Sequence, residues 1–149
     1  MPEEDLEALL NKASGLKGIC GVNDMREILQ MANRGEPLAQ LALELYCYRI
    51  KKYIGAYFAV LGRVDGVVFT GGIGENAAPI RKRCCQGLEG LGVMLDDRKN
   101  EKAFEEVLEI QRDGAPVKVL AVRTKEEREI AEQTVATLLR AREGEGKTP

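Results

Sequence analysis

Any chemistry in this chain of 149 residues has to use carboxylates, arginine, lysine and backbone amides, because the sequence contains no histidine. That absence removes the commonest general base and every Ser-His or Cys-His nucleophile pair. The four cysteines, Cys20, Cys47, Cys84 and Cys85, show no C-x-x-C spacing. We interpret them as reduced thiols, mostly in the core, rather than as metal ligands. A formal net charge of -2 argues against a nucleic-acid-binding surface.

The segment Gly71–Asn76, with the letters GGIGEN, is the strongest candidate binding site. It follows the apolar run 66–70, and the ligands of open α/β sheets bind at the carboxyl ends of strands. Glycines let a ligand approach the backbone without a Cβ in the way, and a helix start beside them offers free N–H groups. The segment matches neither the dinucleotide-binding pattern nor a Walker loop. A tight turn without a ligand is therefore an alternative interpretation.

Two further groups of residues place charge at predicted helix starts. Asp24 could accept from sugar hydroxyls while Arg26 covers a base ring or pairs with a phosphate. The alternative is that Asp24 is a helix cap and Arg26 a surface charge.

Thr124 and Glu127 have capping-box spacing, which leaves Glu126 without a structural role. That carboxylate could bind Mg2+, which prefers hard oxygen ligands, or could be solvated in the first turn of a helix.

The elements that must position these residues follow from turn signals and from hydrophobic spacing. A continuous apolar run at 66–70 is typical of a strand covered on both faces. In chain order the sequence predicts a helix over 5–13, a loop over 14–24, a helix over 25–34, a long helix from Pro37 that ends at Gly62, a strand over 66–70, a helix capped by Glu75 or Asn76 and ended by 90–92, a strand at 93–95, a hairpin of 107–110 with 117–122, and a final helix over 125–141.

These elements predict one mixed α/β domain over residues 1–141, followed by a polar frayed tail over 142–149. The acidic amino terminus, Met1-Pro2-Glu3-Glu4-Asp5, precedes no long apolar run. It is typical neither of a signal peptide nor of a membrane span, so we expect a cytoplasmic protein.

Several segments occur together and in order: LNKASGLKGICGVNDMREI, YRIKKYIGAYFAVLGRVDGVVFTGGIGENAAPIRKR, GLEGLGVMLDDRKN and VKVLAVRTKEE. This series closely resembles the carboxyl-terminal part of the acetate kinase family, over about residues 10–139. The resemblance implies the actin-like, ribonuclease H-like ATPase fold, in which two α/β lobes hinge around a cleft. The chain would be most of the second lobe, a mixed sheet flanked by helices, in truncated form.

The resemblance also assigns site residues and cofactors. The cofactors are ATP or ADP with Mg2+, and the metal residue is Glu126, flanked by Arg123 and Lys125 where the family usually has other residues. Those two positive charges would compete for the carboxylate. The nucleotide-binding residues are Asp24, Met25, Arg26, Gly72, Ile73, Gly74, Glu75, Asn76 and Ile80.

The family reaction converts ATP and acetate into ADP and acetyl phosphate. The resemblance implies that its catalytic Asp, its acetate-site Arg, and the Asn and Lys near phosphate and metal belong to the earlier part of the enzyme, which has no counterpart in this sequence. We therefore expect no catalytic residue here and little or no turnover by the chain alone. Three hypotheses stay open: a half-enzyme that needs a partner chain with the first lobe, a non-catalytic nucleotide-binding or dimerisation module, and a non-functional remnant. A homodimer is a further implication, and the family's related carboxylates, propionate and butyrate, are alternatives to acetate.

Overall fold

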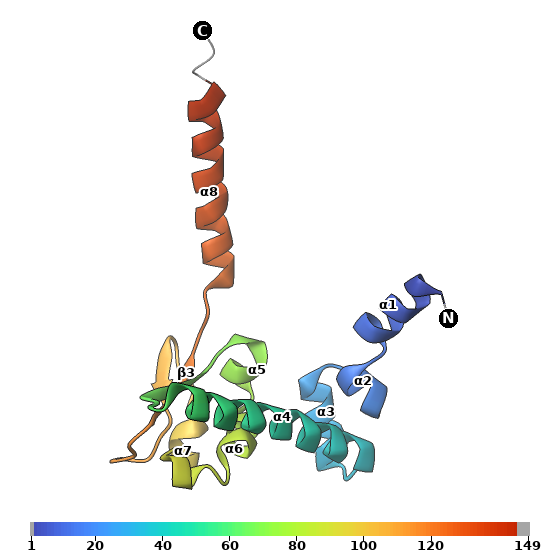
Figure 1. Cartoon of the computed structure of the whole chain (residues 1–149), viewed down its shortest axis with the longest axis vertical. Coiled ribbons are helices and arrows are strands. Elements are labelled where there is room, and N and C mark those ends of the chain that lie inside the picture. Colours follow the sequence, from blue (N-terminus) through green and yellow to red (C-terminus); the bar gives the residue numbers. More distant parts are fainter. Residues whose placement is uncertain (1, 146–149) are drawn as a thin grey trace.

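The chain is mostly helical, with a small sheet and a long carboxyl-terminal helix (Figure 1). The computed structural model describes residues 2–145. In chain order its elements are α1 (Glu3–Lys12), α2 (Gly15–Cys20), α3 (Met25–Asn33), α4 (Pro37–Leu61), β1 (Gly66–Phe69), α5 (Gly71–Asn76), α6 (Ala78–Cys85), the 3-10 turn η1 (Glu89–Leu91), α7 (Asp97–Asn100), β2 (Val107–Glu109), β3 (Lys118–Val122) and α8 (Glu126–Glu145).

The three strands form one mixed sheet in the order β1-β3-β2. β1 runs parallel to β3, with Phe69 opposite Ala121, whereas β2 pairs antiparallel with β3 and completes the predicted hairpin. Because β1 and β3 are parallel, their carboxyl ends lie at the same edge of the sheet. α5, which follows β1, and α8, which follows β3, therefore begin at one edge.

One face of the sheet is buried and the other is open, which corrects the expectation that β1 is covered on both faces. Phe69, Val119 and Ala121 lie on the buried face. Val68 points to the opposite face, where it is 55 % exposed. Successive side chains of a strand alternate between faces, so packing on one side leaves every second residue in solvent.

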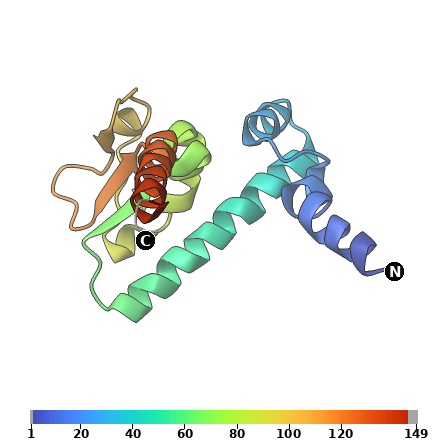
Figure 2. The same cartoon turned by 90° about the horizontal axis from the view of Figure 1, so that it is seen from above.

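The long helix α4 joins two groups of elements (Figure 2). α1, α2 and α3 lie at its amino-terminal half, and the sheet with α5, α6 and α7 lies toward its carboxyl-terminal half. Leu43 of α4, Ile28 of α3 and Cys84 of α6 belong to one hydrophobic core. The predicted bounds of α4 are confirmed, from Pro37 to the positive-φ residue Gly62.

Residues 15–20 form helix α2, where the sequence predicted a loop. Gly15 and Gly21, at φ 62 and 85, open and close this helix. Leu16 and Ile19 pack against the core. This tertiary contact outweighs the weak helix propensity of a short segment that contains glycine.

The glycine-rich segment is itself a helix, α5, and this corrects the expected cap of the next helix. Ala77 separates α5 from α6, so neither Glu75 nor Asn76 caps α6. Both side chains instead bond within α5: Gly71 N–H donates to Glu75, and Asn76 donates to the Gly72 carbonyl. The side chains of Glu75 and Asn76 are therefore bonded to backbone groups of α5 and not to the first turn of α6.

Two further predictions near α6 are wrong in their extent. α6 ends at Cys85, before the predicted stop at 90–92, because Gln86 adopts an extended backbone. The predicted strand at 93–95 is reduced to a single bridge between Leu95 and Gln111.

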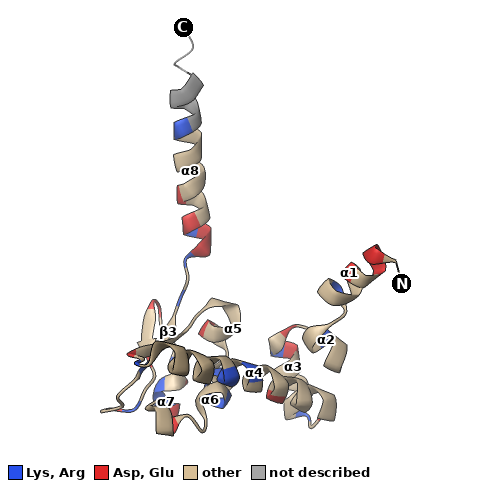
Figure 3. Cartoon of the chain, viewed as in Figure 1, with Lys and Arg blue, Asp and Glu red and all other residues tan. Residues whose placement is uncertain are grey.

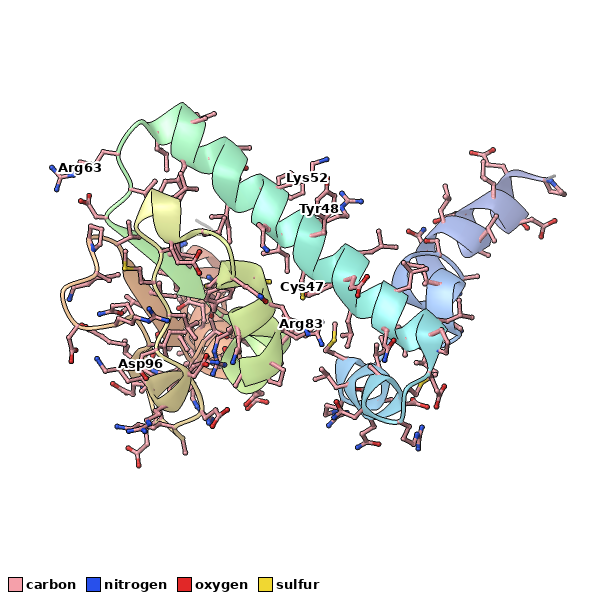
Figure 4. The ribbon with its side chains drawn as sticks, turned by 90° about the horizontal axis from the view of Figure 1, so that it is seen from below. Cys47, Tyr48, Lys52, Arg63, Arg83 and Asp96 are labelled. Atoms are coloured by element: carbon pink, nitrogen blue, oxygen red, sulfur yellow. The ribbon has the colours of Figure 1, made fainter. Side chains whose placement is uncertain are left out.

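All four cysteines are free, and three of them are buried between α4 and α6. Burial raises the pKa of the Cys85 thiol to about 12. Figure 4 shows Cys47 on the inner side of α4 near Arg83, with Tyr48 and Lys52 on the outer side. The interpretation of these cysteines as core thiols agrees with this packing.

α8 projects away from the rest of the chain and carries exposed apolar side chains. These are Ile130, Val135, Leu138 and Leu139, each between 55 % and 66 % exposed. Among residues 2–145 the helices are too short or too polar to cross a bilayer. Of the predicted polar tail, residues 142–145 continue α8, and 146–149 lie outside the described part.

Candidate functional site

Glycine occupies three positions of α5 for different structural reasons. Gly71 has φ 71, a conformation that side chains other than glycine rarely adopt. A Cβ on Gly74 would lie 3.0 Å from the backbone carbon of Phe69, so Gly74 lets α5 approach β1 closely. A Cβ on Gly72 would meet nothing within 4 Å and Gly72 has no positive φ. The fold therefore requires glycine at 71 and 74 but not at 72.

Glu75 connects α5 to the start of α8. Its Oε1 accepts from the N–H of Gly71 at 3.0 Å, from the N–H of Thr124 at 2.9 Å and from the Thr124 hydroxyl at 2.9 Å. Hydrogen bonds from Thr124, and a weaker one from Gly71, hold the pKa of Glu75 below its ordinary value. This carboxylate is thus kept charged and fixes the two segments that leave the sheet at the same edge.

A hollow lies between these two segments, with a cavity volume of about 480 Å3. We call it the α5–α8 hollow, and its lining consists of Gly72, Glu75 and the run Thr124, Lys125, Glu126, Glu127 and Arg128. Gly72 is the glycine that the fold does not require, and its missing side chain leaves the α5 wall of the hollow open. The hydroxyl and the N–H of Thr124 both donate to Glu75, and α8 begins only at Glu126, so the predicted capping box of Thr124 and Glu127 is not formed.

The charges around Glu126 are arranged differently from what the sequence suggested. The ammonium of Lys125 pairs with Glu106, and the guanidinium of Arg123 stacks over Phe104, 5.3 Å from the ring centroid. Both cations that flank Glu126 in sequence therefore have partners elsewhere. Figure 3 shows acidic residues gathered at the first turn of α8, namely Glu126, Glu127 and Glu129. Glu126 is exposed at the rim of the hollow.

Asp24 and Arg26 lie at the start of α3. Asp24 accepts from the Arg26 N–H at 2.8 Å, which confirms it as the helix cap, and its other oxygen pairs with the guanidinium at 2.6 Å. These bonds lower the pKa of Asp24 to about 2. Arg26 is 88 % exposed. Figures 1 and 2 show α3 and α5 on the same side of α4.

The predicted nucleotide residues Met25 and Ile80 are 5 % and 2 % exposed. Both side chains belong to the hydrophobic core and offer little surface to a ligand. Conversely, two residues that hold α5 in place, Thr124 and Arg81, were not predicted to do so from the sequence. Thr124 was interpreted only as a cap, although its position after β3 could have drawn attention to it. Arg81 donates to backbone carbonyls of α5, and its position in the sequence gives no indication of these contacts.

This arrangement, a mixed sheet whose strand ends carry a glycine-rich helix, matches solved structures of short-chain carboxylate kinases. The acetate kinase of Porphyromonas gingivalis superposes with a TM-score of 0.82 at 40 % identity, over 93 % of this chain and 35 % of that one. A propionate kinase from Francisella tularensis gives 0.77 at 41 % identity, over 85 % and 32 %. The fold class expected from the sequence, part of the actin-like ATPase fold, is confirmed.

The sequence comparison identifies the family. The model of the acetokinase family matches residues 1–132, and the chain belongs to this family. The acetate kinase of Syntrophobacter fumaroxidans is 62 % identical over 93 % of this chain, and that of Lawsonia intracellularis is 49 % identical over 89 %. The chain spans about a third of the length of these curated relatives, 34 % and 33 % respectively.

Proposed function

We propose that this chain is the nucleotide-binding part of an acetate kinase, with residues 1–141 forming most, but not all, of its second lobe. The single observation that carries the proposal is Gly72, which opens the wall of the α5–α8 hollow although neither φ nor packing requires glycine there. An omitted side chain at a strand end lets a ligand approach the backbone. The ligand is ATP or ADP, and the reaction of the whole enzyme transfers the γ-phosphoryl group of ATP to acetate.

The residues have distinct roles in this proposal. Gly72, Ile73 and Gly74 present backbone to the nucleotide, Asn76 contacts it, and Glu75 keeps α5 fixed against Thr124. Asp24 and Arg26 bind the adenosine end, where an exposed planar guanidinium is suited to cover a base. Phosphoryl transfer depends mainly on such positioning and on neutralising charge, so a lobe without a nucleophile can still serve it.

Mg2+ would be held by Glu126 together with phosphate oxygens. The donor chemistry fits, since Glu126 offers a hard carboxylate at the rim of the hollow while Lys125 and Arg123 are engaged by Glu106 and Phe104. Among residues 2–145 no group of three or more His, Cys, Asp or Glu side chains could hold a metal. One protein carboxylate with phosphate and water is the usual arrangement for Mg2+ bound to a nucleotide. When bound, the ion would neutralise charge on the phosphates.

Calorimetric titration of ADP and ATP, with and without Mg2+, tests this function. We expect binding that Asn76→Ala and Arg26→Ala both weaken. Arg63→Ala is the matched control, because Arg63 forms the same kind of exposed pair with Asp65, at 2.7 Å, as Arg26 forms with Asp24. Absence of heat and of a thermal shift at millimolar nucleotide, or equal effects of Arg26→Ala and Arg63→Ala, would count against the assignment.

We further propose that the polypeptide of 149 residues does not complete the reaction by itself. Its length, about a third of the curated relatives, supports this view. Colorimetric detection of acetyl phosphate from ATP and acetate is the direct assay. Turnover at rates typical of kinases, about 1 to 100 per second, would contradict the proposal.

A second candidate function, association with another chain, is favoured by the exposed apolar residues of α8. Val135, Leu138 and Leu139 have the i, i+3, i+4 spacing of one helix face, and Ile130 adds exposed apolar surface nearer the start of α8. We propose that the partner is a second copy of this chain or a chain with the remaining parts of the enzyme. Sedimentation velocity of the wild type and of Leu138→Glu separates a self-associating chain from a monomer.

A further inference from the structure

Arg81 of α6 is a buried cation, 2 % exposed, and among the ion pairs of residues 2–145 it has no carboxylate partner. Burial lowers the pKa of its guanidinium. A buried charge is costly unless other groups replace the water that it loses. The partners of Arg81 therefore indicate why an arginine stands at this position.

Backbone carbonyls from two helices and one amide side chain supply those partners. Nη1 donates to the backbone oxygens of Gly74 and Glu75, each at 2.9 Å. Nε donates to Asn100 Oδ1 at 2.7 Å, and Nη2 donates to the Asn100 backbone oxygen at 2.6 Å. Asn100, 2 % exposed, is itself fixed because its Nδ2 donates to the Ala78 carbonyl at 2.9 Å. Arg81 thus connects the last turn of α5 to the end of α7.

α5 needs such support because it has six residues, of which three are glycine. A helix of this length and composition is marginal by itself. The last carbonyls of a helix lack N–H partners within it, and a cation there is favourable to the helix dipole. Arg81 satisfies two of these carbonyls, those of Gly74 and Glu75.

Glu75 is consequently held from two sides. Its side chain lines the α5–α8 hollow and accepts from Gly71 and Thr124, and its backbone oxygen accepts from Arg81. We propose that Arg81, anchored by Asn100, is a positioning residue that sets the conformation of α5 for nucleotide binding without touching the nucleotide. This inference rests on the proposed function for its ligand, a nucleoside diphosphate or triphosphate.

Arg81→Lys in the full chain tests the proposal, since it keeps a positive charge but loses the planar fork that reaches both helices. Asn100→Ala is the second variant and removes only the anchor. Arg83→Lys is the matched control, because Arg83 lies on the same helix with an exposed side chain. Two readouts are needed. One is the affinity for ADP by calorimetry. The other is amide hydrogen exchange at Ala77, whose N–H bonds to Ile73, compared with Ile110, which directly follows β2 and whose N–H bonds to Val119 of β3.

For Arg81→Lys we expect exchange at Ala77 to accelerate about ten-fold or more and ADP affinity to fall about ten-fold, the loss typical of a hydrogen bond to a charged group. Exchange at Ile110 should be unchanged beyond about two-fold, and Asn100→Ala should show the same pattern more weakly. The control should match the wild type.

Three results would overturn the proposal. The first is Arg81→Lys with wild-type exchange at Ala77. The second is faster exchange at Ala77 with unchanged ADP affinity. The third is equal acceleration at Ala77 and Ile110 in both variants, which would mean that Arg81 maintains the whole fold. If the wild type binds no ADP, the proposed function fails as well, but the exchange data still report whether Arg81 holds α5, so the two failures are distinguishable.

Discussion

The two segments proposed to meet the nucleotide are held in very different ways. α5 is fixed at one end by Glu75 and Thr124 and at the other by the buried Arg81. At the start of α3, the backbone is anchored in the core by Met25, but the polar side chains Asp24 and Arg26 are held by each other, and Arg26 is 88 % exposed. In α5, contacts distant in sequence position the polar groups, whereas Asp24 and Arg26 are positioned by a partner two residues away.

Because of this difference, substitutions in the two segments should have different effects on the stability of the chain and on nucleotide binding. Residues that hold α5 cannot be changed without loosening α5, so their substitution should affect binding and the local stability of α5 together. Arg26 can be changed with little effect on the fold, because its side chain is 88 % exposed and its guanidinium donates to the neighbouring Asp24. Its substitution should therefore affect binding almost alone.

The largest effect on stability is expected for Gly74→Ala. Its Cβ would lie 3.0 Å from the Phe69 backbone, which cannot move without disturbing β1. Overpacking of this kind costs about 1 to 3 kcal/mol, measurable by urea denaturation.

Gly72→Ala is the matched control, because its Cβ meets open space. We expect stability equal to or above that of the wild type, since alanine favours helix over glycine by up to about 1 kcal/mol. ADP binding should nevertheless weaken. Equal losses of stability in the two alanine variants would contradict the different roles assigned to these glycines.

A smaller effect, of about 1 kcal/mol, is expected for Glu75→Gln, because charge-assisted hydrogen bonds from Gly71 and Thr124 are weakened at a half-exposed site. The effect should depend on pH. The pKa of Glu75 is lowered in the folded chain, so its stabilisation is complete above the ordinary value of 4.5 and is lost as pH falls through the lowered pKa. Denaturation between pH 7 and pH 3 should show the difference from wild type shrinking in acid. Glu105→Gln, at an exposed position, is the control for the removal of one negative charge.

The smallest effect on stability is expected for Arg26→Ala. The N–H of residue 26 still donates to Asp24, so the cap of α3 remains and the melting temperature should hardly change. The pKa of Asp24, now about 2, should rise toward its ordinary value because the guanidinium contributes most to the shift. A carboxyl titration by NMR measures this directly. An unchanged pKa would mean that the ion pair is not formed in solution.

The sequence predicted those parts of the fold that local patterns determine. The cap at Asp24, the length of α4 and the hairpin of β2 with β3 all follow from residues that are close in the chain. The helical conformation of residues 71–76 in α5 could not be predicted from such local patterns. Its helix depends on Arg81 and Thr124, which reach it from other elements, and three glycines in six residues are locally typical of a loop.

The same reasoning applies to the candidate site. Glu75 and Asn76 were named as candidates because the segment has a recognisable pattern, but the hydrogen-bond partners of their side chains could not be predicted. The cations at 123 and 125 were expected to disturb Glu126, and only the spatial positions of Phe104 and Glu106 assign them elsewhere. Side-chain pairing between distant segments leaves little trace in a single sequence.

The most direct test of the account is amide-resolved NMR of the chain during titration with ADP and Mg2+. We predict chemical-shift changes concentrated at residues 71–76 and 124–126, with a second group at 24–26. Replacing Mg2+ by Mn2+ should broaden the signals around Glu126 first. Saturable changes located elsewhere, or none at millimolar ADP, would contradict the claim that the α5–α8 hollow binds the nucleotide.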